Sequence, residues 1–283
     1  MAKKVSVIIP AYNEEEVIGN CLKSLLKQTF KPLEIIVVDD GSTDNTISIV
    51  KNCQLSTVNC QLFRQKHLGP GPARNLGASN AKAEILIFVD ADMTFDKNFI
   101  KDLTAPIQKG ETIGTFSKKE LVANKDNIWS ICWNINRNVP FDMMLPNNYP
   151  NKAPVFRAIL KKEFDKVGGF DATGEYTDDW SLSRKLRVMS TLAPGAIYYH
   201  FNPSNLREVY KQARWIGKNE FISGNLARII RSLIFYSMPV SLIIGIYKSV
   251  SNLKIEFIIF KIVYDLGIFI STFKSFFNEN KAK

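Results

Sequence analysis

One run of the chain, Glu84 to Asp92, constrains the fold more than any other. Six of the seven residues from Ile85 to Ala91 are apolar, and only Asp90 interrupts them. This pattern is typical of a strand that is covered on both faces, in the middle of a parallel sheet. The run ends in two carboxylates, at the edge of the sheet where open α/β proteins bind ligands.

Asp90 and Asp92 are separated by one small residue, Ala91. Two carboxylates at this spacing suit a hard divalent cation, Mg²⁺ or Mn²⁺, which keeps waters and takes phosphate oxygens as its other ligands. The alternative is a turn or helix start that carries Asp residues for structural reasons. The segments before and after this pair distinguish the two interpretations.

The first 110 residues alternate between short apolar runs and amphipathic segments, which predicts a parallel sheet with right-handed crossovers. Helices are expected after each strand, the first of them capped by Asn13 with Glu16 at the capping-box position. The expected strands are Val5–Pro10, Leu33–Val38, Gln61–Arg64 and the run after Glu84; further helices begin at Thr43 or Asp44, after Gly69, and at about Asp96.

The pattern is mixed after residue 110, and it predicts strands over Ala153–Leu160 and Ala196–Phe201 and helices over Lys161–Val167, Asp178–Met189 and Leu206–Phe221. We therefore expect an α/β domain over residues 1–224, with two halves, 1–110 and 111–224. A helical tail over 225–283 follows.

The formal net charge of +10 is compatible with nucleic acid, an anionic membrane or an anionic small substrate as a partner. Residues 228–283 carry eight Lys or Arg and three Asp or Glu, and this segment is also very apolar. That combination favours a membrane surface over nucleic acid. The four cysteines form no Cys-x-x-Cys pair, so we expect no zinc site and a reduced, intracellular state; no secretory signal is visible.

The tail contains two apolar stretches. Leu233–Tyr247 has no charge, and as a helix it would measure about 22 Å, with a kink at Pro239. Ile255–Phe273 is apolar except for one narrow polar stripe, formed by Lys254, Lys261, Asp265 and Thr272. We expect a monotopic or re-entrant membrane-bound hairpin; a hairpin packed on the catalytic domain or in a homodimer, and a pair of spanning helices, are the alternatives.

Four segments in order, Val5–Glu14, Ile36–Asp44, Ala73–Gly77 and Val89–Asp92, make the chain resemble a family 2 glycosyltransferase of the GT-A fold. The resemblance covers roughly residues 4 to 220. It implies an inverting enzyme that uses a nucleoside-diphosphate sugar and a divalent cation, with a catalytic domain over 1–224 whose halves are nucleotide-sugar-binding (1–110) and acceptor-side (111–224).

The resemblance also implies positions that bind the donor. Asp40 would accept hydrogen bonds from the nucleobase, although an Asp before a glycine can simply form a bend. Arg74 would lie near the nucleotide, although it can also be a solvated helix charge. The full set of expected donor-binding residues is Pro10, Ala11, Tyr12, Glu14, Asp40, Arg74, Asp90, Ala91 and Asp92.

In the same way, Asp92 and Asp90 would hold Mg²⁺ or Mn²⁺ against the diphosphate, so that the metal neutralises the leaving group. His200 follows a predicted strand at a position where relatives carry a metal or phosphate ligand. Its alternative is a structural histidine.

The segment Thr177–Leu182 resembles the acidic motif that carries the catalytic base of the family, and the match places the base at Asp179, beside Asp178. Ser181 stands where relatives often have another acid. The alternative is that both carboxylates only cap a helix. Farther on, Lys211, Arg214 and Trp215 resemble a diphosphate- and acceptor-binding motif of processive members, with Lys211 in place of Gln.

Together these features predict a membrane-associated glycosyltransferase with a cytoplasmic catalytic domain, a UDP- or GDP-linked donor and a hydroxyl of a lipid-linked or glycan acceptor. A polyprenyl phosphate acceptor is the near alternative. A membrane scaffold that binds a nucleotide sugar without turnover is the alternative of another class. No nucleic acid partner is expected.

Overall fold

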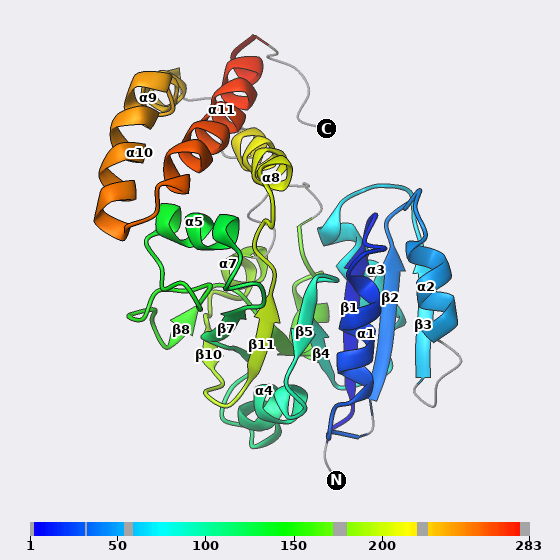
Figure 1. Ribbon diagram of the computed structural model, residues 1–283. Coiled ribbons are helices and arrows are strands. Elements are labelled where there is room, and N and C mark those ends of the chain that lie inside the picture. The colour runs from blue at the N-terminus through cyan, green and yellow to red at the C-terminus, as the bar shows by residue number, and fades with distance from the viewer. Residues whose placement is uncertain (1–2, 32, 54–58, 172–179, 220–225, 278–283) are drawn as a thin grey trace. The chain divides into compact units, whose positions relative to one another are not determined.

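The computed structural model describes residues 3–31, 33–53, 59–171, 180–219 and 226–277 (Figure 1). The chain forms two compact units. One contains residues 1–121 and 148–200, here called the sheet unit, and the other contains residues 122–147 and 201–283, here called the helical unit. The boundary expected at residue 224 remains a prediction.

The sheet unit is built on an eight-stranded sheet in the order β3-β2-β1-β4-β9-β6-β10-β8. β1, β2, β3 and β4 pair in parallel, whereas β9 is antiparallel to β4 and β6. The expected α/β fold with a mostly parallel sheet is confirmed. The strands are β1 (Val5–Ala11), β2 (Leu33–Asp39), β3 (Asn59–Arg64), β4 (Ile85–Phe88), β6 (Gly114–Phe116), β8 (Lys152–Ala153), β9 (Ala158–Leu160) and β10 (Ser190–Leu192).

Three further strands form a second, small sheet in the order β5-β11-β7. β5 (Met93–Phe95) follows Asp92 directly, β7 spans Lys119–Val122, and β11 spans Ile197–His200. The helices of the sheet unit are α1 (Ile18–Leu26), α2 (Thr46–Cys53), α3 (Pro70–Asn80), α4 (Phe99–Gln108), α6 (Lys161–Lys166) and α7 (Ser181–Leu186).

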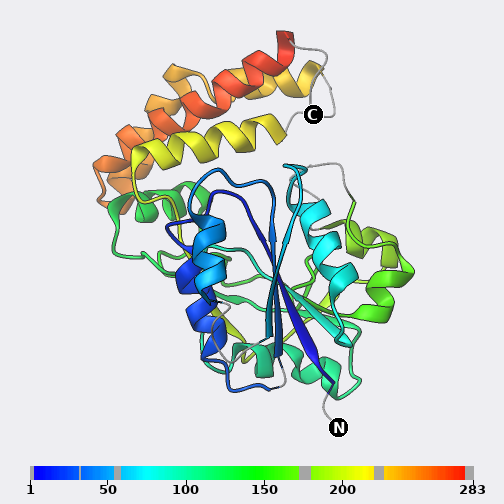
Figure 2. The same ribbon diagram turned by 90° about the vertical axis from the view of Figure 1, so that its right-hand side faces the viewer.

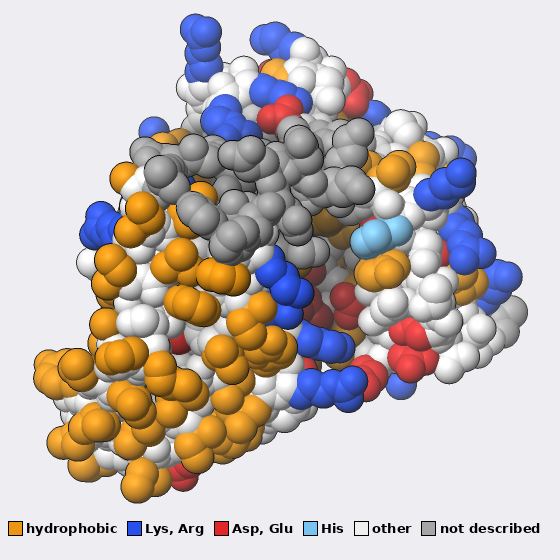
Figure 3. All heavy atoms as spheres, turned by 90° about the horizontal axis from the view of Figure 1, so that it is seen from above, with side chains coloured by type: hydrophobic (Ala, Val, Ile, Leu, Met, Phe, Trp, Pro, Cys, Tyr) orange, Lys and Arg blue, Asp and Glu red, His pale blue; other side chains and the backbone are white. Residues whose placement is uncertain are grey.

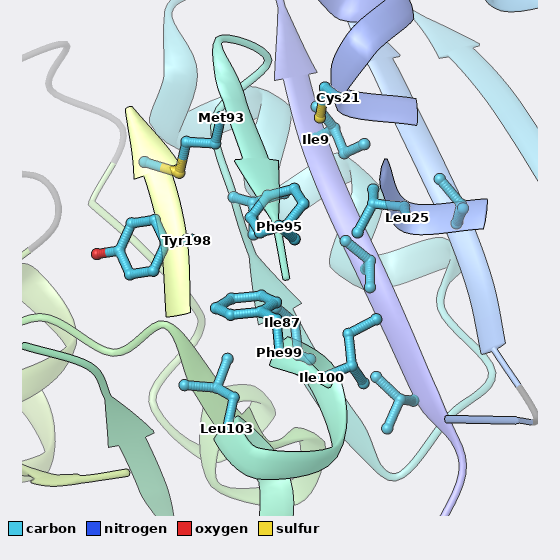
Figure 4. Packing of buried hydrophobic residues seen from close by; sticks show 14 of the residues in the cluster. Ile9, Cys21, Leu25, Ile87, Met93, Phe95, Phe99, Ile100, Leu103 and Tyr198 are labelled. Carbon is cyan, nitrogen blue, oxygen red and sulfur yellow. The ribbon is translucent and has the colours of Figure 1, made fainter. Parts of the chain in front are cut away.

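Helices cover both faces of the sheet at β1 (Figure 2). Both faces of β1 are buried, because its side chains alternate between two hydrophobic clusters. Val7 and Ile9 pack in the cluster that contains α1 and α4, and Ile8 packs in the cluster that contains α3. Figure 4 shows the first cluster, in which Ile9 lies near Leu25 of α1. On the other face α3 approaches very closely, since a Cβ at Gly77 would lie 2.5 Å from the Ile8 side chain.

The helical unit contains α5 (Ile128–Arg137), α8 (Leu206–Asn219), α9 (Leu226–Phe235), α10 (Met238–Asn252) and α11 (Glu256–Phe277). Its core joins α5, α8 and α11 through Cys132, Trp133, Ile135, Val209, Phe257 and Phe260. Within the described chain, no helix alone is long and apolar enough to cross a membrane; Ala227–Phe235 and Met238–Asn252 meet those two conditions only as a pair, bent by 54°.

Two local expectations were wrong. Asn13 does not cap a helix, because it adopts a positive φ of 56° and its side chain accepts a hydrogen bond from the Thr43 amide; α1 begins only at Ile18. The expected strand over 153–160 is two short strands, β8 and β9. In the tail, the bend expected near Pro239 is present: α9 ends at Phe235, α10 begins at Met238 after a bend of 54°, and Pro239 lies in the first turn of α10, where its missing amide costs no hydrogen bond.

Candidate functional site

Three strands of the sheet unit end at one edge of the sheet. Ala11 at the end of β1 pairs with Asp39 at the end of β2, and Ile8 of β1 pairs with Phe88 at the end of β4. The polar residues that follow these strands therefore leave the sheet at the same edge, as parallel pairing requires. This brings Tyr12 to the edge that also carries the two carboxylates after β4.

Asp90 is held by two arginines. Its Oδ1 lies 2.8 Å from Nη2 of Arg74 on α3, and its Oδ2 lies 3.3 Å from Nη1 of Arg157, which precedes β9. Burial alone would raise the pKa of Asp90, but the charges of the two guanidinium groups hold it well below its usual value. Both carboxylate oxygens of Asp90 are thus engaged by cationic side chains.

Asp92 lies next to His200 because β5 and β11 pair antiparallel, with Met93 opposite His200. The Asp92 Oδ2 atom lies 3.0 Å from the His200 Nε2 atom. The other oxygen, Oδ1, is buried and has no hydrogen-bond partner among the described residues. A buried carboxylate oxygen without a partner is costly, and a bound cation would satisfy it.

Glu120 completes this arrangement from the third strand of the small sheet. Its Oε1 lies 2.8 Å from His200 Nδ1, and its Oε2 accepts a hydrogen bond of 2.9 Å from the Tyr198 hydroxyl. Burial alone would lower the pKa of His200, but the charges of Asp92 and Glu120 raise it well above its usual value. The imidazolium ring is therefore fixed between two carboxylates.

A second cluster surrounds Asp40 at the end of β2. The buried Asp40 carboxylate accepts hydrogen bonds from the amides of Leu68 and Gly69 and lies 2.9 Å from Nδ1 of His67. The His67 ring stacks on Tyr12, with centroids 3.9 Å apart. Asp40 thus holds the segment that presents an exposed pair of rings, a suitable surface for a planar base.

Glu14 lies within the electrostatic influence of both carboxylates. Burial, followed by the negative charges of Asp92 and Asp90, raises the pKa of Glu14 to about 7. The backbone amide of Glu14 donates to the Thr46 hydroxyl, which holds this side chain beside the acidic cluster.

The remaining expected residues are spread over both units. Ala11 and Ala91 are buried and Pro10 is partly buried in the sheet unit. Lys211, Arg214 and Trp215 lie on α8 of the helical unit, where the Arg214 guanidinium donates to the Ser271 hydroxyl of α11. The expected base Asp179 and its neighbour Asp178 lie outside the described residues.

The sequence analysis missed three residues of this site: Arg157, Glu120 and His67. Arg157 and Glu120 reach the site only through pairings of distant strands, and no local pattern marks them. His67 could have been noticed, because it is one of only two histidines and it precedes the glycine-proline segment that starts α3.

The described residues contain no group of three or more His, Cys, Asp or Glu side chains that could hold a metal by themselves. A single available carboxylate oxygen on Asp92 nevertheless fits Mg²⁺ or Mn²⁺, because these ions are often held by one or two carboxylates together with substrate phosphates and water. Asp90 fits less well, since Arg74 and Arg157 occupy its oxygens.

Comparisons with known proteins agree with this architecture. The glycosyltransferase GlyG of Streptococcus pneumoniae is 36% identical over 110 residues, which cover 38% of this chain and 36% of that protein. The poly(ribitol-phosphate) beta-N-acetylglucosaminyltransferase TarS of Staphylococcus aureus is 39% identical over 110 residues, 38% of this chain and 19% of TarS. The matched region thus spans well under half of these relatives.

Two solved structures share the fold. The crystal structure of S. aureus TarS 1–349 with UDP-GlcNAc has a TM-score of 0.57 at 18% identity, covering 99% of this chain and 93% of that one. The mannosyltransferase PcManGT of Pyrobaculum calidifontis, solved with GDP-Man and Mn²⁺, has a TM-score of 0.61 at 16% identity, covering 99% and 89%. The GT-A fold is therefore confirmed.

The model of the family described as Glycosyl transferase family 2 matches residues 6–168. These residues include all of β1 except Val5, the two carboxylates after β4, and both arginines that hold Asp90. Because the match covers more than half of the 283 residues, this chain belongs to glycosyl transferase family 2.

Proposed function

We propose that this protein transfers a sugar, with inversion, from a nucleoside-diphosphate sugar to a hydroxyl of a lipid-linked or glycan acceptor at a membrane surface. The observation that carries the proposal is the buried, unpartnered Oδ1 of Asp92 at the carboxyl edge of the sheet. That position matches the role of a carboxylate that binds a cation together with the donor diphosphate.

Asp92 would hold Mg²⁺ or Mn²⁺, and the metal would supply electrostatic stabilisation of the leaving nucleoside diphosphate. His200, fixed by Glu120, keeps the Asp92 carboxylate in place. The Tyr12–His67 ring pair offers a stacking surface to the base of a UDP- or GDP-linked donor. The donors and the Mn²⁺ present in the TarS and PcManGT structures support this choice of ligands.

Asp179 remains the proposed base that takes the proton of the acceptor hydroxyl as its oxygen attacks the anomeric carbon. The membrane part of the proposal rests on the helical unit, which exposes large apolar side chains while it buries polar ones. Figure 3 shows hydrophobic side chains gathered over this unit. Ile243 and Val250 of α10 are 68% and 70% exposed.

The test is donor turnover by the full chain in detergent or with membrane lipid extract, with Mn²⁺ and a panel of UDP- and GDP-sugars. We expect release of nucleoside diphosphate from one donor, increased by lipid. Asp92→Asn should lower this rate by about 10²- to 10³-fold, because it removes stabilisation of charge that develops in the transition state.

Asp96→Asn is the matched control, because Asp96 lies four residues farther along, beyond β5, and its side chain bonds only the Asn98 amide in the described structure. Equal rates for Asp92→Asn and the unaltered protein would refute the proposed metal site. Donor binding without turnover in any lipid extract would favour the non-catalytic scaffold, and activity on a lipid phosphate that survives Asp179→Asn would favour the polyprenyl phosphate acceptor.

A further inference from the structure

A cavity of about 540 Å³ lies within the helical unit, and none of its described lining residues is one assigned above to the donor or metal. Its walls come from the end of α5, the end of α9, and the middle of α10 and α11. Three of the wall residues are cationic, Arg137, Lys248 and Lys261, and none of its described lining residues is Asp or Glu.

The three cations are held in different ways. The Lys248 ammonium donates to the Ile135 carbonyl and to the Asn138 side chain at the end of α5, at 2.8 Å each. Lys261 is buried and pairs with Asp265 at 2.8 Å. Arg137 is exposed; its Nη2 donates to the Met144 carbonyl, and that contact leaves most of the guanidinium fork available.

The charges do not cancel within the cavity. Lys261 is paired with the Asp265 carboxylate, whereas no ion pair among the described residues involves Arg137 or Lys248. Burial lowers the pKa of Lys248, and repulsion from Lys261 adds to that effect. The α5 carbonyls at this end carry partial negative charge, but the bond from Lys248 offsets it. The cavity therefore attracts an anion.

The rest of the wall is aromatic and adjoins the exposed apolar surface. Phe235, Tyr236, Tyr247 and Tyr264 line the cavity, and Tyr247 is 71% exposed. Tyrosine rings of this kind suit the boundary between lipid headgroups and acyl chains. Ile243 and Ile246, beside Tyr247 on α10, extend the apolar surface outside the cavity. An anion that carries an apolar body matches this arrangement better than a free ion.

We propose that this cavity binds the phosphate headgroup of an anionic membrane lipid, with Arg137 in direct contact and Lys248 and Lys261 supplying positive charge. The inference rests on the membrane association proposed above and makes it specific. Arg137 fits a phosphate bidentately, and the aromatic wall covers the glycerol and upper acyl region.

The test is co-flotation of the full chain with vesicles of phosphatidylcholine alone and of phosphatidylcholine mixed with phosphatidylglycerol, at about 0.15 M salt. The unaltered protein should bind both, and the mixed vesicles more tightly. Arg137→Gln should weaken binding to the mixed vesicles about tenfold or more and leave binding to phosphatidylcholine unchanged. Lys248→Gln is the second variant of a cavity cation. Lys248 is chosen in place of Lys261, because removal of Lys261 would disturb a buried ion pair.

Lys274→Gln is the matched control, because it removes one exposed positive charge of the same unit outside the cavity and should cost less than about fivefold. Equal losses of binding to the mixed vesicles in Arg137→Gln and Lys274→Gln would overturn the proposed phosphate site in the cavity. Such a result would leave only a diffuse electrostatic attraction between the helical unit and the anionic vesicles. Equal binding of the unaltered protein to both vesicles would also overturn the phosphate site, while membrane association would stand. Absence of binding to any vesicle would refute both, whereas donor turnover in detergent tests the transferase activity separately. Displacement from the mixed vesicles by millimolar glycerol phosphate would identify a free phosphate ester as the ligand instead.

Discussion

The sheet unit and the helical unit place charged and apolar side chains in opposite ways. In the sheet unit, valine, isoleucine and leucine side chains fill both faces of the sheet, and the ion pairs of Asp90 and Asp92 lie at one edge. In the helical unit, Lys261 and Asp265 are buried while Ile243, Val250 and Tyr247 are largely exposed. The arrangement of the sheet unit is typical of a protein surrounded by water. The arrangement of the helical unit is typical of a surface that contacts a partly apolar medium.

Two ion pairs with the same spacing make this comparison quantitative. Lys161 and Asp165 on α6 of the sheet unit lie 3.0 Å apart, with side chains 25% and 53% exposed. Lys261 and Asp265 on α11 lie 2.8 Å apart, with side chains 5% and 1% exposed. Only the second pair is isolated from solvent, so only there does the loss of one partner leave an uncompensated buried charge.

The largest expected effect follows from this pair. Lys261→Met should destabilise the protein by about 3 to 5 kcal/mol, measured as the free energy of unfolding in urea with detergent. Lys161→Met, the matched control, should cost less than about 1 kcal/mol. Replacing both partners, with Lys261→Met and Asp265→Leu, should restore most of the stability. Similar losses in the free energy of unfolding for Lys261→Met and Lys161→Met would show that removing one partner of an ion pair has the same cost in both units.

The next effect concerns the charges at the edge of the sheet. Glu120→Gln should weaken Mn²⁺ binding about 10- to 100-fold, because an amide holds the His200 imidazolium less firmly against Asp92. The measurement is an electron paramagnetic resonance titration of free Mn²⁺ with the donor nucleotide present. Glu111→Gln, an exposed carboxylate of the same unit, should leave the affinity unchanged. Rescue by Glu120→Asp would support positioning, and unchanged affinity in Glu120→Gln would exclude it.

A smaller effect should appear in the pH dependence of stability. The pKa of Glu14 is about 7 in the folded protein against 4.5 as its ordinary value, so between these pH values the folded state binds more protons than the unfolded state. Stability therefore falls as pH rises through this window. In protein without metal, Glu14→Gln should remove this fall and gain about 1 to 2 kcal/mol at pH 8, after allowance for partial exposure. Thermal melts at pH 5 and pH 8 check this, with exposed Glu16→Gln as the control; a parallel pH profile for both variants would contradict it.

The smallest effect on stability should come from the exposed apolar surface of the helical unit. Ile243→Ser should change the free energy of unfolding by about 0.5 kcal/mol or less, while it reduces binding to phosphatidylcholine vesicles. Ile268→Ser on α11, at a fully buried position, should cost about 2 kcal/mol or more. A large loss of stability in Ile243→Ser would place this residue in a packed interior and would remove the contrast between the units.

The sequence alone was sufficient to predict the mostly parallel sheet, because buried strands and amphipathic helices are marked by residues that are neighbours along the chain. The run from Ile85 to Asp92 predicted both the central strand β4 and the carboxylates after it. Four motifs in order predicted the family, which the family model confirms. The apolar tail and its polar stripe were also visible, since their periodicity is local.

The tertiary structure decided what each charge does. Asp90 is paired with Arg74 and Arg157, and Asp92 with His200, because strands and helices far apart in sequence end beside one another. The polar stripe of α11 could have faced solvent, but the packing of α10 on α11 buries Lys261 and Asp265. Periodicity shows that a helix has two faces, whereas only the packing of distant segments determines which face lies inside and which carboxylate oxygen remains available to a ligand.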